Sequence, residues 1–332
     1  MRRFRATAPA ALAASVLVLA ACGEDAAEPQ AEGGGEPAAA EYPTERITLI
    51  VPYAAGGPIT LMGQTVGTCL EEEFGQTVVV ENREGASGSV GMQAMLAGGN
   101  DGHTIGIIAV PASATNPLQD DVGYTNEDYV PIAVGEVIPS VLAVGADSQF
   151  ADAEAFFQYA KENPGELNVG VPGATTSQAM ELRRMAELYD VEVTAVPFNG
   201  NAEMTTALLG GNVDAVFINS TEDVLQNIEA GSFTPLAVSP EEPIEYIDAP
   251  TLAQVGFPEL VYSTSVWGFA APAGVPDDVV STLESAIENC LSKEETIETL
   301  GEQYVPDEFI GSEEFAARID DIVEVYGPIL QD

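Results

Sequence analysis

Short apolar runs alternate with helical patterns along most of this chain of 332 residues, and this alternation restricts the folds that the chain can adopt. Ile47–Val51 and Thr104–Val110 have the apolar character of buried parallel strands, and residues 60–74 between them have a helical pattern. The same order recurs between residues 152 and 238. Strands that alternate with helices in this way predict an α/β fold, with mostly parallel sheets flanked by helices.

The composition excludes several classes of partner. Hydrophobic residues make up 46% of the chain, so a core can form, and chains longer than about 250–300 residues usually divide into two domains. The net charge is −43, from 53 acidic and 10 basic residues. Because phosphate binding needs clustered Lys and Arg, nucleic acid is excluded, and the folded part is not expected to dock on an anionic membrane surface.

The first 21 residues have the pattern of an export signal. Arg2, Arg3 and Arg5 precede an uncharged, mostly apolar run that is shorter than the ~20 residues of a spanning helix. The run ends in Leu19-Ala20-Ala21-Cys22, which resembles the lipobox of bacterial lipoproteins. We therefore predict a signal peptide over residues 1–21 and a lipid on Cys22 that anchors the protein at the extracytoplasmic face of the cell membrane. The alternative is an ordinary secretory signal followed by an incidental cysteine.

Residues 22–41 are predicted to be a flexible acidic tether. They are rich in Gly, Ala, Pro and Glu and have no apolar periodicity, so they cannot bury a core. The folded body is therefore expected to begin near Tyr42.

The carboxyl ends of the predicted strands supply the candidate ligand site. In open α/β sheets ligands bind at these ends, against helix N-termini that hold carboxylates through backbone N–H groups without a Lys or Arg. Gly-rich turns and Ser or Thr caps are also common in α/β proteins that bind nothing there. The candidate ligand-binding residues are Tyr53, Ala55, Gly56, Gly57, Ser113, Asn116, Thr175, Thr176, Ser177 and Asn219.

A family resemblance covers nearly the whole chain after the tether. The segments that carry it lie in order along the sequence: ITLIVPYAAGGP (47–58), VVVENREGASGSVG (78–91), VPFNG (196–200), LLGGNVDAVF (208–217) and GFAAPAGVP (268–276). They resemble the substrate-binding proteins of tripartite tricarboxylate transporters, the Bug family. The match is far more specific than any single Gly motif.

The resemblance implies a two-domain fold of the periplasmic-binding-protein type (type II-like), with the ligand cleft between the domains. Residues 42–144 plus 268–332 would form the first domain and residues 145–267 the second, with crossings near Ala143–Asp147 and Val266–Ala270. The implied function is to capture a small carboxylated solute and deliver it to membrane permease subunits, as a monomer without a cofactor. The alternative is a solute-sensing lipoprotein that presents its ligand to a signalling receptor.

Some residues depart from the family pattern and bear on the ligand. Thr60 and Ile218 replace acids that are usual in the family, which weakens the case for an amino-acid ligand because its ammonium would need a carboxylate. Asn199 replaces a lysine. The guanidinium groups that could contact a ligand are those of Arg83, Arg183 and Arg184, and each has a structural alternative.

The sequence gives little support to an enzyme. It has no Gly-x-Ser-x-Gly elbow, and a Ser-His-Asp triad would have to use His103, the only histidine. His103 precedes an apolar strand, where a structural or surface role is expected. A hydrolase is therefore the least supported alternative, and no catalytic residue and no metal site are predicted.

If Cys22 carries the lipid, Cys69 and Cys290 are the two cysteines that remain. In an exported protein their oxidation to a disulfide is permitted. If the C-terminal segment returns to the first domain, as the resemblance implies, both cysteines belong to that domain. A disulfide and two independent buried thiols are the two possibilities.

The excess of carboxylates predicts that salt stabilises the fold. Surface carboxylates repel one another, and added salt screens that repulsion. The melting temperature should therefore rise as sodium chloride is added from low ionic strength. A melting temperature that stays constant across the salt series would contradict this expectation.

Overall fold

The computed structural model describes residues 42–174, 176–198 and 200–330. The predicted signal peptide and tether, with Cys22, lie outside the described residues, and so does Thr175. In the described part of the chain, no helix is both long and apolar enough to cross a membrane.

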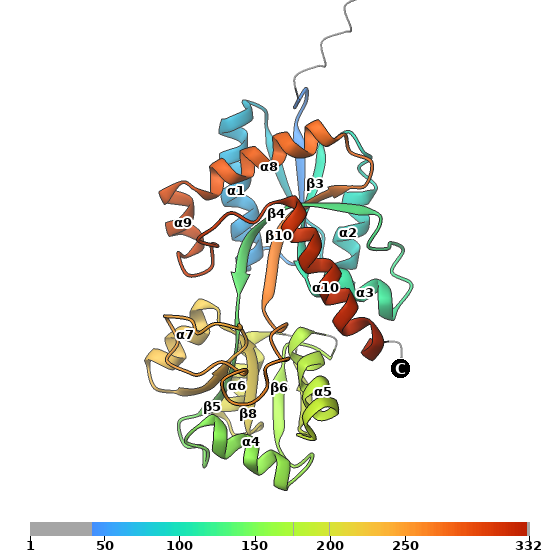
Figure 1. The fold of residues 1–332 in the computed structure, drawn as a ribbon. Helices are drawn as coiled ribbons and strands as arrows, with labels where there is room; N and C mark the ends of the chain where they lie inside the picture. The colour runs from blue at the N-terminus through green and yellow to red at the C-terminus, as the bar shows by residue number, and fades with distance from the viewer. Residues whose placement is uncertain (1–41, 175, 199, 331–332) are drawn as a thin grey trace, which may run out of the picture. The chain divides into compact units, whose positions relative to one another are not determined.

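The first sheet has the strand order β2-β1-β3-β10-β4 (Figure 1). β1 runs parallel to β2 and β3, whereas β10 is antiparallel to β3 and β4. Its strands are β1 (Ile47–Val51), β2 (Val78–Asn82), β3 (Thr104–Val110), β4 (Tyr129–Ile138) and β10 (Ser265–Pro272). The helical segments of this domain are α1 (Pro58–Phe74), the 3-10 turn η1 (Ala86–Gly88), α2 (Ser89–Leu96), α3 (Ala112–Gln119), α8 (Asp277–Leu291), α9 (Glu294–Leu300) and α10 (Ser312–Leu330).

The second sheet has the strand order β7-β6-β8-β5-β9. β6 runs parallel to β7 and β8, whereas β5 is antiparallel to β8 and β9. Its strands are β5 (Ser140–Gly145), β6 (Asn168–Val171), β7 (Thr194–Pro197), β8 (Ala215–Asn219) and β9 (Phe233–Val238). The helices of this domain are α4 (Ala153–Glu162), α5 (Ser177–Tyr189), α6 (Asn201–Leu209) and α7 (Glu222–Glu229).

The fold is the two-domain α/β arrangement that the sequence predicts, but both sheets are mixed. The antiparallel pairs arise where the chain passes between domains, because β5 and β10 each enter a sheet directly from the other domain. β4 ends at Ile138 and β5 begins at Ser140, so the first crossing is at Pro139. Residues 140–144, predicted for the first domain, therefore pair in the second sheet, and residues 265–267, predicted for the second, pair in the first.

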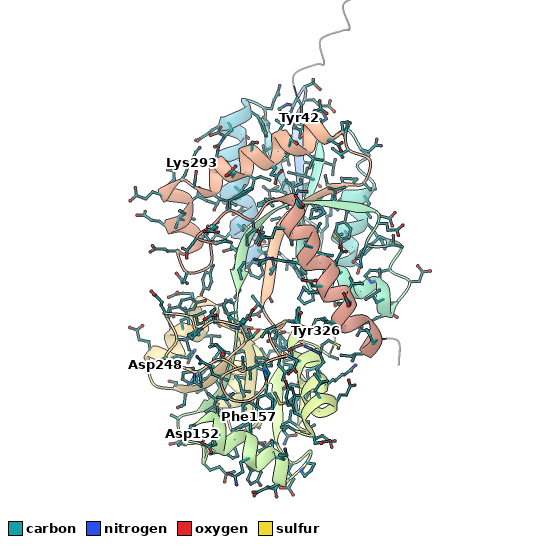
Figure 2. The ribbon with its side chains drawn as sticks, in the orientation of Figure 1. Tyr42, Asp152, Phe157, Asp248, Lys293 and Tyr326 are labelled. Atoms are coloured by element: carbon teal, nitrogen blue, oxygen red, sulfur yellow. A yellow bond between two sulfur atoms is a disulfide. The ribbon has the colours of Figure 1, made fainter. Side chains whose placement is uncertain are left out.

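Each domain has its own apolar core. In the first domain α1 and α8 pack on one face of the sheet. Leu49 of β1 and Met62 of α1 are fully buried in the core that results. In the second domain Phe156 and Phe217 are fully buried on the α4 side of the sheet, and Phe157 lies beside them (Figure 2).

Tyrosine side chains of the C-terminal segment also contact the second domain, apart from the strands at the two crossings. The hydroxyl of Tyr326, which is fully buried on α10, donates to Glu181 of α5 over 3.0 Å (Figure 2). The hydroxyl of Tyr304 donates to the carbonyl oxygen of Ser220 over 2.7 Å. These two hydrogen bonds therefore join the domains.

A disulfide joins Cys69 on α1 to Cys290 on α8, with their Cα atoms 5.8 Å apart. Both residues belong to the core of the first domain although they are 221 positions apart in the sequence. The bridge therefore ties the C-terminal segment to α1, the first helix of the described residues.

The disulfide predicts a measurable contribution to stability. On the chain-entropy account, a bridge that closes so long a loop stabilises the fold by a few kcal/mol. Replacing both residues, as Cys69→Ala with Cys290→Ala, should lower the melting temperature, and reductant should do the same to the unsubstituted protein. The check is the number of thiols that react in denatured, unreduced mature protein. We expect none from this pair, and two titratable thiols would contradict the bridge.

Candidate functional site

A cavity of about 600 Å³ lies where loops of both domains meet. It is lined at the carboxyl ends of β1, β3, β6 and β8, which is where open α/β sheets bind ligands. Larger hollows of about 720 and 690 Å³ are each lined by the second domain alone and contain no such convergence of strand ends. The residues lining the 600 Å³ cavity are Tyr53–Ile59, Ala109–Ala112, Pro172, Thr176–Gln178, Asn219, Ser265 and Trp267.

Three helices present uncapped N-termini to this cavity. α1 follows Gly57, α3 follows Pro111 and α5 follows Thr176, and none of these cap residues offers a side-chain acceptor to the first turn. The hydroxyl of Thr176 donates to the carbonyl oxygen of Gly173 over 3.1 Å. The first N–H groups of a helix lack intrahelical acceptors, and the positive end of the helix dipole lies there. The cavity can therefore bind an anion through backbone groups.

No charged side chain lines the cavity among the described residues. The three guanidinium groups considered from the sequence lie elsewhere. Arg83 pairs with Glu81, and Arg183 is exposed on α5. Arg184 is nearly buried, with Nη1 2.7 Å from a carboxylate oxygen of Glu181. A ligand in the cavity would thus meet dipoles and neutral polar groups.

The loop after β1 is held in place by side-chain hydrogen bonds. The amide Nδ2 of Asn82, at the end of β2, donates to the carbonyl oxygen of Tyr53 (2.8 Å) and to Oγ1 of Thr60 (2.9 Å). The Thr60 hydroxyl in turn donates to the carbonyl oxygen of Ala54 over 3.2 Å. Thr60 is therefore a buried anchor of the loop, and this explains how the position can do without the acid that is usual in the family.

Glycine is required at one position of this loop for its conformation. Gly56 has φ +92°, which L side chains rarely adopt. A Cβ atom placed on Gly57 would meet no other atom within 4 Å, because this residue borders the open cavity. A side chain at residue 57 would thus occupy ligand space without disturbing the fold.

The structure brings most of the predicted site residues together. Tyr53, Ala55, Gly56, Gly57, Thr176, Ser177 and Asn219 all line the cavity. Burial raises the pKa of Tyr53 to about 12, so its hydroxyl stays protonated.

Ser113 and Asn116 do not line the cavity, contrary to expectation. The hydroxyl oxygen of Ser113 accepts from the backbone N–H of Ala109 over 3.1 Å. The amide of Asn116 donates to the carbonyl oxygen of Ser87 and to the hydroxyl of Ser89, both at 3.1 Å. Their polar groups therefore fasten α3 to its neighbours within the first domain.

Among the lining residues that sequence reasoning missed, Gln178, Ser265 and Trp267 have side chains that can form hydrogen bonds. Gln178 follows Ser177 in the first turn of α5, so a longer reading of that helix start would have included it. Ser265 and Trp267 lie on β10, and their alternation along the strand puts both on the cavity side.

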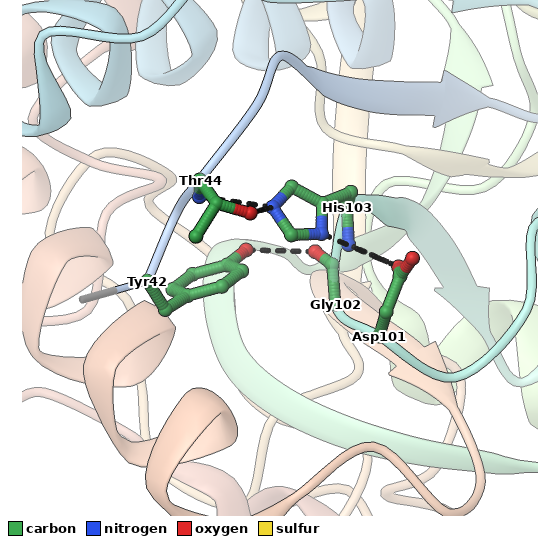
Figure 3. A network of polar contacts seen from close by, with 5 residues as sticks. All are labelled: Tyr42, Thr44, Asp101, Gly102 and His103. Atoms are coloured by element: carbon green, nitrogen blue, oxygen red, sulfur yellow. Dashed lines mark hydrogen bonds and ion pairs between the residues drawn. The ribbon is translucent and has the colours of Figure 1, made fainter. Parts of the chain in front are cut away.

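His103 belongs to a polar network at the opposite end of the first domain (Figure 3). Its Nε2 accepts from the backbone N–H of Thr44 over 3.2 Å, and the hydroxyl of Tyr42 donates to the carbonyl oxygen of Gly102 over 2.7 Å. A carboxylate oxygen of Asp101 accepts from the backbone N–H of His103 over 2.9 Å. The network fastens the first described residues of the chain to the loop before β3.

The same histidine could contribute to a cation site with Glu45 and Asp101, whose ligand atoms lie within 4.8 Å of one another. However, Thr44 occupies the lone pair of Nε2, so the neutral ring carries its proton on Nδ1 and has no lone pair left for a metal. The hydrogen bonds therefore favour a structural role for His103.

The chain matches the sequence model of a known family over residues 63–332, and that family is described as "Tripartite tricarboxylate transporter family receptor". The UPF0065 protein of the tcbD–tcbE intergenic region of Pseudomonas sp. is 32% identical over 263 residues, which cover 78% of this chain and 77% of that protein. Protein BugT of Bordetella pertussis is 30% identical over 268 residues, which cover 79% and 81% of the two chains.

Solved structures are similar over most of the fold. A TctC solute-binding protein from Polaromonas has a TM-score of 0.74 at 26% identity, covering 87% of this chain and 99% of that one. Rpa4515 of R. palustris, solved with adipate, has a TM-score of 0.70 at 28% identity, covering 86% and 99%.

The buried carboxyl group of Glu136 predicts a pH dependence of stability. Glu136 lies on β4 opposite Trp267 and is 3% exposed, and among the described residues Oε2 has no hydrogen-bond partner. Burial raises its pKa to about 8 from an ordinary 4.5, so the folded state holds a proton that the unfolded state has released between these values. The free energy of unfolding should therefore fall as pH rises through this interval, by at most about 1.4 kcal/mol per pH unit from this group.

The variant Glu136→Gln removes that contribution. Denaturant unfolding should show the variant and the unsubstituted protein closest in stability near pH 5. Near pH 8.5 the variant should be more stable by a few kcal/mol, because only the unsubstituted protein then buries an ionised carboxylate. A stability difference that is the same at both pH values would contradict the prediction.

Proposed function

Because the chain belongs to the tripartite tricarboxylate transporter receptor family, we propose that it binds a small carboxylate-bearing solute in the cavity at the strand ends. Members of this family are periplasmic solute-binding receptors and not enzymes. The observation that carries the proposal is the convergence of three uncapped helix N-termini on a cavity without a charged side chain among its described residues. A carboxylate can accept from these N–H groups, and the helix dipoles favour its charge.

The size and polarity of the cavity support a small organic acid. Its volume of about 600 Å³ lies within the ~300–1,000 Å³ range of small-molecule sites. The similar protein Rpa4515 was solved with adipate, a dicarboxylate. An amino acid is disfavoured, because Thr60 anchors the loop and no carboxylate lines the described part of the cavity to pair with an ammonium.

Binding is expected to favour the closed arrangement of the domains. Gly57 belongs to the first domain and Thr176 to the second, so one ligand can contact both. A ligand shifts a conformational equilibrium only by its difference in affinity for the two states, and contacts to both domains exist together only when the cavity is closed. The closed receptor would then be recognised by membrane permease subunits.

Lipid attachment at Cys22 would hold the receptor at the extracytoplasmic face of the cell membrane, as a monomer on the tether of residues 22–41. A receptor so placed can either deliver solute for uptake or present it to a signalling protein. Deletion of the receptor distinguishes the two functions, since delivery predicts loss of solute uptake and sensing predicts unchanged uptake.

A substitution at Gly57 tests the proposed site. Gly57→Val should abolish binding of small carboxylates, because the side chain would fill the space beside the first turn of α1. The fold should be unaffected, since a Cβ at this position meets no other atom within 4 Å. Binding is measured by thermal shift and calorimetry with a series of mono- and dicarboxylates that includes adipate.

Gly57→Ala is the matched control, with a single added methyl group and a smaller expected loss. Gly57→Val that binds as tightly as the unsubstituted protein would contradict the placement of the site. Failure of every carboxylate in the series to bind the unsubstituted protein would contradict the proposed function itself.

A further inference from the structure

One side-chain oxygen in the cavity wall accepts hydrogen bonds from two residues. The Oδ1 atom of Asn219, at the end of β8, accepts from Nε2 of Gln178 over 2.7 Å and from Oγ of Ser265 over 3.1 Å. The Oγ atom of Ser140 lies 3.3 Å from the same oxygen, but the single proton of that hydroxyl is donated to the carbonyl oxygen of Ser263. Because this oxygen is occupied, the remaining hydrogen-bonding capacity of the Asn219 side chain is its –NH₂ group, which can only donate.

These three residues come from different elements. Ser140 is the first residue of β5, directly after the first crossing between domains, and Ser265 is the first residue of β10, directly after the second. Gln178 lies in the first turn of α5, whose N-terminus faces the cavity. Asn219 thus connects the cavity to both strands on which the domains would hinge.

The hydrogen bonds among these residues have consistent directions. The two N–H bonds of Gln178 Nε2 point to Asn219 Oδ1 and to Ser140 Oγ, the latter over 2.8 Å. The Ser140 hydroxyl donates to the carbonyl oxygen of Ser263, next to the second crossing. Because the Ser140 hydroxyl has donated its only proton, its oxygen can only accept from Gln178, and this fixes the orientation of the Gln178 amide. Oε1 of Gln178 then accepts from the hydroxyl of Ser177 over 3.2 Å.

Burial of the surrounding residues disfavours the opposite orientation of the Asn219 amide. Ser140 and Ser263 are fully buried, and Gln178 is 1% exposed. A rotation of the Asn219 amide would place its –NH₂ group against the Gln178 donor and leave buried N–H groups without an acceptor, which costs free energy.

We infer that Ser140, Gln178 and Ser265 position Asn219 as an obligatory hydrogen-bond donor to the ligand and couple ligand binding to both crossing strands. The inference rests on the proposed function and makes it more specific. Asn219 selects for an acceptor such as a carboxylate at this end of the ligand. Ser140 acts through Gln178 and Asn219 and lines no part of the cavity, so it is a positioning residue.

The isosteric variant Asn219→Asp tests the donor role. A carboxylate can still accept from Gln178 and Ser265, so the unliganded protein should keep its melting temperature. Its second oxygen would face the ligand where the –NH₂ group was, and affinity for adipate or another carboxylate that binds the unsubstituted protein should fall by about 100-fold or more.

The pair Ser140→Ala and Ser239→Ala tests the positioning role. Both residues are fully buried serines, and the Ser239 hydroxyl accepts from the Ser140 backbone N–H over 2.9 Å. Within the described residues, the Ser239 hydroxyl forms no hydrogen bond with Asn219 or Gln178. Ser140→Ala should weaken carboxylate binding by about tenfold, because the loss of one hydrogen bond to Gln178 leaves the Asn219 –NH₂ group less well aligned with the ligand. Ser239→Ala should leave the affinity unchanged, whatever it does to stability.

Trp267 provides a second measurement, because it is the only tryptophan of the chain and lies on β10 in the cavity wall. The ligand-induced change in its emission should saturate at about tenfold higher ligand concentration in Ser140→Ala than in Ser239→Ala. Equal affinities of these two variants, or normal carboxylate binding by Asn219→Asp, would overturn the inference while leaving the proposed function intact. Absence of carboxylate binding by the unsubstituted protein would overturn both.

Discussion

The starts of α1, α3 and α5 converge on the cavity, and the proposed mode of binding depends on this convergence. The first N–H groups of a helix need acceptors, and here none of Gly57, Pro111 and Thr176 supplies one from its side chain. The α/β order of each domain brings these starts to the carboxyl edges of its sheet, and the two crossings bring the edges together at the cavity. In the proposed function, a carboxylate would accept from N–H groups of these first turns.

This mode of binding is compatible with the chain's extreme acidity. A receptor with a net charge of −43 has few cations to use, and those described are placed in ion pairs or at the surface. Lys293 lies between Glu72 and Glu73 at 3.9 and 3.2 Å, and Arg184 neutralises the buried Glu181. Backbone dipoles are fixed by the fold and involve no long side chain, so the binding site can be neutral while the surface stays acidic.

Apolar periodicity predicted most of the strands and helices in both domains, because elements such as β1, β3 and α5 carry uninterrupted patterns. It missed β4, β5 and β10, because the strands at the crossings follow one another without the helix that marks a parallel unit. For the site, strand ends and helix starts located Gly57, Thr176 and Asn219. They could not show that Ser113 and Asn116 bond within the first domain, since that depends on the packing of α3. Nor could they identify Gln178 and Ser265 as partners of Asn219, since these residues are far apart in the sequence.

The central claim is that backbone N–H groups and the Asn219 amide hold a carboxylate in the cavity. Calorimetric titration of the purified protein with adipate and with its uncharged diamide tests it most directly, because the two molecules differ little in size. The account predicts that the dicarboxylate binds and that the diamide binds at least about 100-fold more weakly, since it gives up the charge-assisted hydrogen bonds. Equal affinities for the two molecules would contradict it.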